Sequence, residues 1–257
     1  MTDTLIRRDV SNGIATVTLA SPGTLNALST QMLRALEESF AALAADTGIR
    51  VVILAAEGKA FSAGHDLKEM NGYHVDADGG RTAFETLFHL CARVMQHIAA
   101  LPQPVIAQVQ GTATAAGCQL ACSCDLIVAS ETARFGVNGI NLGLFCSTPA
   151  VALSRRLAPG VAFELLTTGE FLAAPRAHAL GVVNRLAPPD QLAEETRKLA
   201  ETIAAKDPAA IRLGKRGFQA QLGQPLPQAY ATAGAIMVEN ALLPATAQGI
   251  QRFIDRR

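Results

Sequence analysis

Three short segments of the sequence contain residue types that can bind an anion or a polarised carbonyl oxygen. Residues 59–68 (KAFSAGHDLK), 110–120 (QGTATAAGCQL) and 134–149 each follow an apolar run. Small residues where a strand passes into a helix leave backbone N–H groups unpaired and partially positive. Two such strand ends in one sheet predict an oxyanion-stabilising site. The competing interpretation is two ordinary strand-to-helix turns, in which Gly and Ala permit close packing.

The first segment also has cations at both of its ends. Lys59 and Lys68 flank the glycine-containing loop, and both can pair with phosphate groups. A loop that leaves a buried parallel strand lies at the edge of the sheet where α/β folds bind ligands. The pattern therefore favours a ligand that carries phosphates as well as a carbonyl group.

Hydrophobic periodicity indicates the elements that would position these segments. Continuous apolar runs at residues 50–55, 105–109 and 125–129 are typical of strands buried on both faces. Residues 84–98 have a helical period and lie between the first two runs, so strand, helix and strand predict a right-handed parallel crossover. Asn12-Gly13 between two alternating runs predicts a β-hairpin.

The second half of the chain is predicted to be almost wholly helical after Leu157. Capping and breaking residues predict the boundaries: Ser29 caps the first helix, Pro175 and Gly181 bracket a short one, and Asp190 and Asp207 cap two more. Residues 182–186 are expected to be extended, and residues 72–80 to form a mobile surface loop. We divide the chain into a core, residues 1–189, and a helical C-terminal region, residues 190–257.

Composition excludes several classes of protein. Of the 257 residues 49% are hydrophobic and 17% charged, which is typical of a globular fold and not of a disordered chain. Lys+Arg and Asp+Glu both number 22, and no basic run indicates nucleic-acid binding. No apolar stretch reaches the ~18 residues that a membrane span needs.

The cysteines and the N-terminus bear on the compartment. The five cysteines are odd in number and lack CxxC spacing, which favours a reduced compartment. Residues 1–9 contain no apolar run typical of a signal peptide and no transit-like pattern. The expectation from these two observations is a bacterial, cytoplasmic protein.

At the level of motifs the sequence resembles the crotonase superfamily, the enoyl-CoA hydratase/isomerase family. The resemblance lies in LNAL at residues 25–28, FSAGHDL at 61–67, AAGCQLACSCDLIVAS at 115–130 and NLG at 141–143, and it runs over essentially the whole chain. It implies an α/β fold of the ClpP/crotonase type, a spiral of ββα units whose helical C-terminal region joins subunits. It also implies acyl-CoA as the ligand, with coenzyme A as part of the substrate and no prosthetic group.

The resemblance also assigns residues. The two oxyanion N–H groups would be those of His65 and Ala116. The CoA moiety would contact Ala27, Lys59, Ala63, His65, Asp66, Leu67 and Lys68, and Phe253 matches a position that reaches CoA bound to a neighbouring subunit. Members of the family are usually homotrimers or dimers of trimers.

The sequence departs from the hydratase pattern at the two catalytic carboxylates. Gln119 and Gly139 stand where hydratases have glutamates. Hydration needs a general base and a general acid, and the loss of one such group typically costs ~10²–10⁴ in rate. An isomerase usually relies on the second glutamate, so that activity is disfavoured as well. We therefore expect a poor hydratase that still stabilises a thioester enolate.

Two alternatives remain open from the sequence. One is a decarboxylase or thioesterase on the same scaffold that uses His65, Asn141 or Cys146, since loss of CO2 needs no base to begin. The segments around His65 and Asn141 resemble methylmalonyl-CoA decarboxylase, although Cys146 replaces a tyrosine expected there. The other is a CoA-ester-binding protein without catalysis. Screening acyl-CoAs for turnover separates these alternatives.

Other residues with reactive side chains have structural interpretations. Cys118, Cys122 and Cys124 are expected to be buried core residues, and Asp125 a hydrogen-bonded carboxylate at a strand start. Ser147 and Thr148 are expected to cap the helix that opens near Pro149. No histidine has the spacing of a metal ligand, so no metal site is expected. The His65 side chain is expected to lie against solvent or nucleotide.

Overall fold

The chain begins with the hairpin that the sequence predicts. In a computed structural model, which describes residues 4–256, β1 (Ile6–Ser11) pairs antiparallel with β2 (Ile14–Leu19). Asn12 and Gly13 have φ values of 53° and 73°, as a two-residue type I′ turn requires. The hairpin forms one edge of a six-stranded sheet with the order β1-β2-β3-β5-β7-β10.

The chain forms two sheets, because a strand-strand-helix unit is repeated and its two strands enter different sheets. The large sheet continues in parallel with β3 (Val51–Ala56), β5 (Val105–Val109), β7 (Leu126–Ser130) and β10 (Arg185–Ala187). The second sheet contains β4 (Ala60–Ser62), β6 (Thr112–Thr114), β8 (Arg134–Gly136) and β9 (Phe171–Ala173). Strands β3, β5 and β7 are each followed by a short strand and then by helices, which confirms the expected spiral of ββα units.

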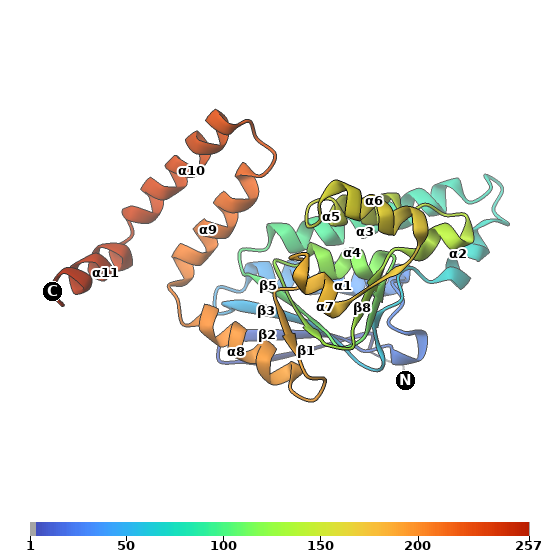
Figure 1. The fold of residues 1–257 in the computed structure, drawn as a ribbon, viewed down its shortest axis with the longest axis horizontal. Coiled ribbons are helices and arrows are strands. Elements are labelled where there is room, and N and C mark those ends of the chain that lie inside the picture. The colour runs from blue at the N-terminus through green and yellow to red at the C-terminus, as the bar shows by residue number, and fades with distance from the viewer. Residues whose placement is uncertain (1–3, 257) are drawn as a thin grey trace.

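The helices cover both faces of the large sheet (Figure 1). Most of them lie on one side: α1 (Thr30–Ala45), α2 (Leu67–Tyr73), α3 (Arg81–Ala100), α4 (Ala116–Ser123), α5 (Ser147–Leu153), α6 (Pro159–Thr168) and α7 (Ala174–Ala179). The other side is covered by α8 (Leu192–Ala204). Val52 and Leu54 therefore enter the main core, whereas Val51 and Ile53 pack in the cluster that contains α8.

Several predicted boundaries are corrected by the structure. Strand β9 was not predicted, because three residues that pair with β8 carry no periodic signal. Asp190 does not cap α8, whose first turn follows Gln191. Ser147 is the first residue of α5, and no side chain caps that helix. Residues 72 and 73 end α2 and are not part of a loop. The caps Ser29 and Asp207 are confirmed.

Three further helices project from the core as an arm (Figure 1). They are α9 (Pro208–Gln221), α10 (Leu226–Ala241) and α11 (Pro244–Ile254), and α9 packs against α10. Many apolar residues of the arm are exposed, among them Leu226 at 70%, Met237 at 71% and Leu242 at 79%. Helix α8 belongs to the predicted helical C-terminal region, but it packs on the large sheet and is therefore part of the core.

A buried ion pair fastens this arm to the core. The Lys215 ammonium group on α9 donates to the Asp125 carboxylate at 2.6 Å and to the carbonyl oxygens of Ile98 and Gln103, both at 3.0 Å. Asp125 also accepts a hydrogen bond from the Val105 N–H, so the predicted structural role of Asp125 is confirmed. The Lys215 side chain is only 7% exposed, so removal of either partner alone would strongly destabilise the fold.

Replacing Lys215→Met is expected to lower the free energy of unfolding by about 3 kcal/mol, because the largely buried Asp125 carboxylate loses its counter-ion. Urea unfolding followed by circular dichroism measures this. The control is Arg216→Met, also on α9, which removes an exposed ion pair with Glu239 of α10 and leaves the midpoint nearly unchanged. Equal effects of the two substitutions would contradict the anchoring role.

Candidate active site

The site is held together by the buried side chain of Asn26. Its Nδ2 donates to the carbonyl oxygens of Glu57 at 2.8 Å and Ala60 at 2.9 Å, and its Oδ1 accepts from the Ser21 N–H at 3.0 Å. Asn26 has φ of 53°, a left-handed conformation that Asn tolerates better than most residues. One amide group thus satisfies three backbone groups and joins the turn before α1 to strand β4.

The backbone on either side of Asn26 continues this attachment. The Ala63 N–H donates to the Leu25 carbonyl oxygen at 3.0 Å, and the Leu28 N–H donates to the Gly64 carbonyl oxygen at 2.7 Å. The Ser62 hydroxyl donates to the Asn26 carbonyl oxygen at 2.8 Å. The LNAL and FSAGH segments, which are far apart in sequence, therefore run side by side. His65 is fixed at the end of this paired stretch, just before α2.

The two predicted oxyanion N–H groups lie on segments that touch. A Cβ atom built on Gly64 would lie 2.9 Å from the Ala115 Cβ and 3.1 Å from the Ala116 nitrogen, so only glycine permits this approach. Ala116 is the first residue of α4, where helix N–H groups are unpaired. Within residues 4–256 neither the His65 N–H nor the Ala116 N–H donates a hydrogen bond. Both donors are thus available to a ligand oxygen.

Backbone strain at Ala115 sets the direction of the second donor. Ala115 precedes α4 with φ of 50° and ψ of −124°, a combination that only glycine adopts readily. Its N–H donates to the Gly136 carbonyl oxygen at 2.9 Å, and this bond helps to hold the conformation. Such strain typically costs about 1–3 kcal/mol and is concentrated at functional sites.

Replacing Ala115→Gly is expected to raise the free energy of unfolding by about 1 kcal/mol, because relief of strain outweighs the greater freedom of glycine in the unfolded chain. Chemical denaturation measures the change. Ala121→Gly is the matched control, since Ala121 lies in the regular part of the same helix and its replacement destabilises by about 1 kcal/mol. If both variants lose stability, the backbone of Ala115 is not strained.

The His65 imidazole is turned inward, which corrects the expectation that it lies against solvent. Its Nδ1 is 3.1 Å from the Leu28 carbonyl oxygen, and its ring meets Phe88 edge-on at 5.6 Å. A carbonyl oxygen only accepts, so Nδ1 carries the proton and Nε2 of the neutral ring has a lone pair. Nε2 is buried and has no partner among the described residues. Burial lowers the pKa of His65, which keeps the ring neutral.

This burial predicts a pH dependence of stability. The folded protein binds the His65 proton less tightly than the unfolded chain does, so stability falls as the pH drops below the ordinary value of 6.5 toward the lowered pKa. Urea unfolding at about pH 7.5 and about pH 5.5 should show a smaller loss for His65→Asn, whose amide still reaches Leu28. An equal loss in wild type and variant would exclude His65 as a source of the dependence.

The two positions at which the resemblance expects glutamates differ in the side chains that they would accept. Gln119 lies one turn after Ala116 on the same face of α4, is 5% exposed, and has a buried Oε1 without a partner among residues 4–256. Gly139 lies in a short 3-10 helix, η2 (Asn138–Leu142). A Cβ atom there would be 2.6 Å from the Leu144 carbonyl oxygen and 2.8 Å from the Cys146 sulfur. A glutamate fits at position 119 without a change of shape, but position 139 is closed.

The two other candidate catalytic residues, Asn141 and Cys146, are not held in positions from which they could act as an acid or a nucleophile. Burial raises the pKa of the Cys146 thiol, an effect that the Gly139 N–H only partly offsets, so the thiolate is disfavoured. Asn141 is exposed, and its amide packs against Gly169 after α6. The Thr114 hydroxyl donates to the neighbouring Asn138 side chain at 2.5 Å. Neither Asn141 nor Cys146 has a contact that would orient it as a nucleophile or acid.

The remaining cysteines are structural, as predicted. Cys118, Cys122 and Cys124 are at most 6% exposed. Hydrogen bonding to Cys122 and burial raise the pKa of Cys118, and burial also raises that of Cys124. The hydrogen bond from Cys118 lowers the pKa of Cys122, but burial keeps all three thiols away from solvent. Across the described part of the chain no cluster of three or more His, Cys, Asp or Glu residues could hold a metal ion.

Most residues predicted to contact CoA lie between Lys59 and Lys68, a stretch that we call the CoA strip, and Ala27 lies in the LNAL segment paired with it. Lys59, Leu67 and Lys68 are exposed, whereas Ala27 and Ala63 are half-buried. The Asp66 carboxylate caps α2, because its Oδ1 accepts from the N–H groups of Lys68 at 2.8 Å and Glu69 at 3.3 Å. Phe253 lies on α11, at the far end of the arm from this strip within one chain (Figure 1). Their contacts with CoA stay predictions.

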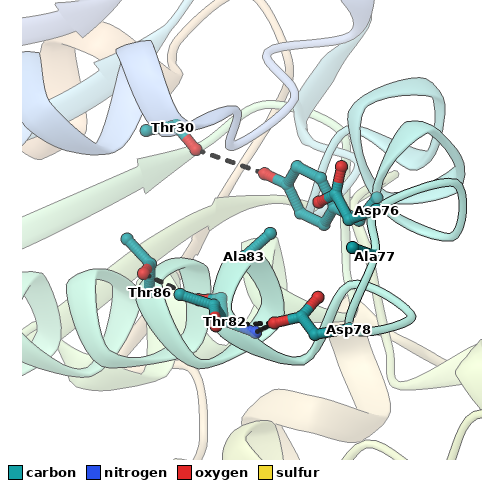
Figure 2. A pocket seen from close by; sticks show the side chains of 8 residues that line it. Thr30, Asp76, Ala77, Asp78, Thr82, Ala83 and Thr86 are labelled. Carbon is teal, nitrogen blue, oxygen red and sulfur yellow. Dashed lines mark hydrogen bonds between the residues drawn. The ribbon is translucent and has the colours of Figure 1, made fainter.

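A pocket that the sequence did not predict lies at the end of α2, the helix that follows this strip, and Figure 2 draws the side chains that line it. It has a volume of about 560 Å³ and lies between the starts of α1 and α3 and the end of α2. Behind its wall the Glu69 carboxylate accepts from the Thr30 N–H at 2.9 Å and the Tyr73 hydroxyl at 2.8 Å. The i, i+4 spacing of Glu69 and Tyr73 was the only available signal, and it is too common to be specific.

The fold and the pair of unpaired N–H groups define a protein of the crotonase type, and the comparisons agree. The chain belongs to the enoyl-CoA hydratase/isomerase family, whose model matches residues 9–257. The crystal structure of an enoyl-CoA hydratase from Mycobacterium smegmatis is 48% identical, with a TM-score of 0.94 over 99% of this chain and 98% of that one. No helix within residues 4–256 is long and apolar enough to cross a membrane.

The chain is also similar to one particular member of the family. The AGCQL and GLFCSTP segments of this chain resemble those of enoyl-CoA hydratase domain-containing protein 3. The mitochondrial protein of that name from Rattus norvegicus is 43% identical over 96% of this chain and 80% of its own length. The crystal structure of the human protein is 40% identical, with a TM-score of 0.93 over 99% of this chain and 98% of that one. The resemblance is confirmed.

These relatives overturn one expectation. The rat, frog, mouse and human proteins are all named as mitochondrial, which contradicts the predicted cytoplasmic location. That prediction depended on the absence of a targeting pattern from residues 1–9, and residues 1–3 lie outside the described part of the chain. A missing pattern is weaker evidence than four named relatives.

Proposed function

We propose that the protein binds acyl-CoA thioesters and stabilises their enolates between the N–H groups of His65 and Ala116. The observation that carries this proposal is the pair of unpaired donors on two segments in contact at Gly64. A single oxyanion donor is typically worth ~2.7–4 kcal/mol to a developing negative charge. Lys59 and Lys68 are proposed partners for the CoA phosphates, because both are exposed beside the same loop.

We also propose that the protein hydrates enoyl-CoA thioesters poorly at this site. Hydration requires one group to take a proton from water and another to supply a proton to the α-carbon. Gln119 does not titrate, and Gly139 has neither a side chain nor room for one. The neutral His65 ring retains a lone pair, but its Nε2 is buried. Binding without efficient hydration is therefore the proposed behaviour toward an unsaturated thioester.

The experiment compares crotonyl-CoA hydration and binding in the wild type and in Gln119→Glu. We expect both proteins to bind with similar affinity in calorimetry, and the variant to hydrate about 10²-fold faster, because one proton-transfer group is restored. Gln219→Glu is the control, since it adds the same charge on the exposed surface of α9. Adding Gly139→Glu to Gln119→Glu is expected to give no further gain, because its side chain meets Leu144 and Cys146.

Each result has a distinct meaning. If the wild type hydrates as fast as the variant, the acid–base groups lie elsewhere and the poor-hydratase proposal fails. If no crotonyl-CoA is bound, the acyl-CoA site itself is wrong. If acyl-CoAs bind but a screen finds no turnover, the protein is the non-catalytic CoA-ester binder considered from the sequence.

A decarboxylase or thioesterase is less well supported. A thioesterase that uses Cys146 needs a thiolate, and burial raises the pKa of that thiol. Asn141 packs against Gly169 and is not held over the two N–H groups by any contact. These observations count against Cys146 and Asn141 as the reactive groups of a thioesterase or decarboxylase.

Assembly into trimers or dimers of trimers is part of the proposal. The arm exposes apolar side chains that a monomer would leave in water, including Leu226, Met237 and Leu242. Burial of these residues against a second copy would also bring Phe253 of one chain toward the CoA strip of another. The core of residues 1–189 would then bind acyl-CoA, and residues 190–257 would join the subunits.

A further inference from the structure

The pocket at the end of α2 has an unusual hydrogen-bonding character on its α1 and α2 side. The Tyr73 hydroxyl donates its single proton to Glu69 at 2.8 Å. The Thr30 hydroxyl lies 3.5 Å from the Tyr73 oxygen, and it must be the donor there because the Tyr73 proton is already used. Figure 2 shows this contact at the back of the pocket. Both hydroxyl groups therefore offer a ligand only lone pairs.

The α3 side of the pocket has the same character. The Thr82 hydroxyl donates to the Asp78 carboxylate at 2.6 Å, and the Thr86 hydroxyl donates to the Thr82 carbonyl oxygen at 2.8 Å (Figure 2). A hydroxyl has one proton and two lone pairs. Because the Thr82 and Thr86 hydroxyl protons are both used in hydrogen bonds within the protein, these two hydroxyl groups offer a ligand only lone pairs. Every hydroxyl of the pocket thus accepts hydrogen bonds and donates none to a ligand.

Carboxylates add negative charge to these acceptors. Asp76 is exposed at the pocket, and its carboxylate has no partner among residues 4–256. Hydrogen bonds from Thr82 lower the pKa of Asp78, so Asp78 is ionised. Glu69 lies behind Tyr73, and hydrogen bonds from Thr30 and Tyr73 lower its pKa in spite of desolvation. No Lys or Arg lines the pocket to offset these charges.

A line of aromatic rings connects the pocket with the proposed oxyanion site. His65 meets Phe88 at 5.6 Å, Phe88 stacks on Phe84 at 6.0 Å, and Phe84 meets Tyr73 edge-on at 5.2 Å. Phe84 and Phe88 are only half-buried, so they retain exposed apolar surface. An alkyl chain whose thioester is held at His65 can follow these rings and end at Tyr73.

We propose that this pocket receives the far end of the acyl group and selects chains that end in a hydrogen-bond donor, a hydroxyl or an ammonium group, over chains that end in a carboxylate. The inference rests on the proposed acyl-CoA function and names its substrate class. A terminal donor fills the unused lone pairs of Tyr73, Thr82 and Thr86. A terminal carboxylate meets these lone pairs and the negative charges of Asp76 and Asp78, which weakens binding.

The test uses four CoA esters of one chain length: decanoyl-CoA, ω-hydroxydecanoyl-CoA, ω-aminodecanoyl-CoA and sebacoyl-CoA. Dissociation constants are measured by calorimetry with the full chain. We expect the hydroxy and amino esters to bind at least about tenfold more tightly than sebacoyl-CoA, which carries the terminal carboxylate. Decanoyl-CoA is expected to lie between them. Tighter binding of the amino than the hydroxy ester would show that charge dominates, and equal binding that hydrogen bonding dominates.

The variant Asp76→Asn isolates the charge, because the Asp76 side chain has no partner to lose. We expect sebacoyl-CoA to bind about fivefold more tightly to this variant and decanoyl-CoA to bind unchanged. Asp190→Asn is the control, since it removes an exposed carboxylate elsewhere on the surface and should change neither constant.

The outcomes separate this inference from the proposed function. If none of the four esters binds, both fail together. If all four bind with equal affinity, or if sebacoyl-CoA binds best, acyl-CoA binding stands and the selection by this pocket is refuted. If Asp76→Asn changes decanoyl-CoA and sebacoyl-CoA binding alike, charge selection at the pocket is refuted as well.

Discussion

The whole site depends on one buried amide, that of Asn26. Its side chain satisfies three backbone groups, so the turn before α1 and strand β4 cannot separate without leaving those groups unpaired inside the protein. The paired segments end at His65, and Gly64 brings that end against the first turn of α4. The spacing of the two N–H groups is thus set by the packing of the protein itself, which is what a preorganised donor pair requires.

Under the proposed function, the site keeps backbone groups that would bind charge and lacks side chains that would transfer protons. The donors at His65 and Ala116 are kept by strain at Ala115 and by close backbone contact. Proton transfer needs side chains of suitable pKa, and positions 119 and 139 supply none. These two requirements are physically independent, because one is met by backbone geometry and the other by side-chain identity.

The sequence predicted what depends on local pattern. The Asn12-Gly13 hairpin, the buried strands and the Ser29 cap follow from turn chemistry and periodicity, and motif resemblance supplied the fold and the family. The closed space at Gly139 and the inward turn of His65 could not be predicted, because both depend on residues brought together only by folding, such as Leu144 and Phe88. The use of every hydroxyl proton in the pocket likewise depends on distances that spacing does not fix.

The contact of Gly139 with Leu144 and Cys146 has an evolutionary consequence. A carboxylate cannot be gained at this position by one substitution without a clash of its Cβ atom with a backbone oxygen. The segment from Leu144 to Cys146 would have to move first, and that change alone confers no acid or base. Under the proposed function, a second carboxylate at this position therefore requires at least two changes, and the first of them supplies no acid or base.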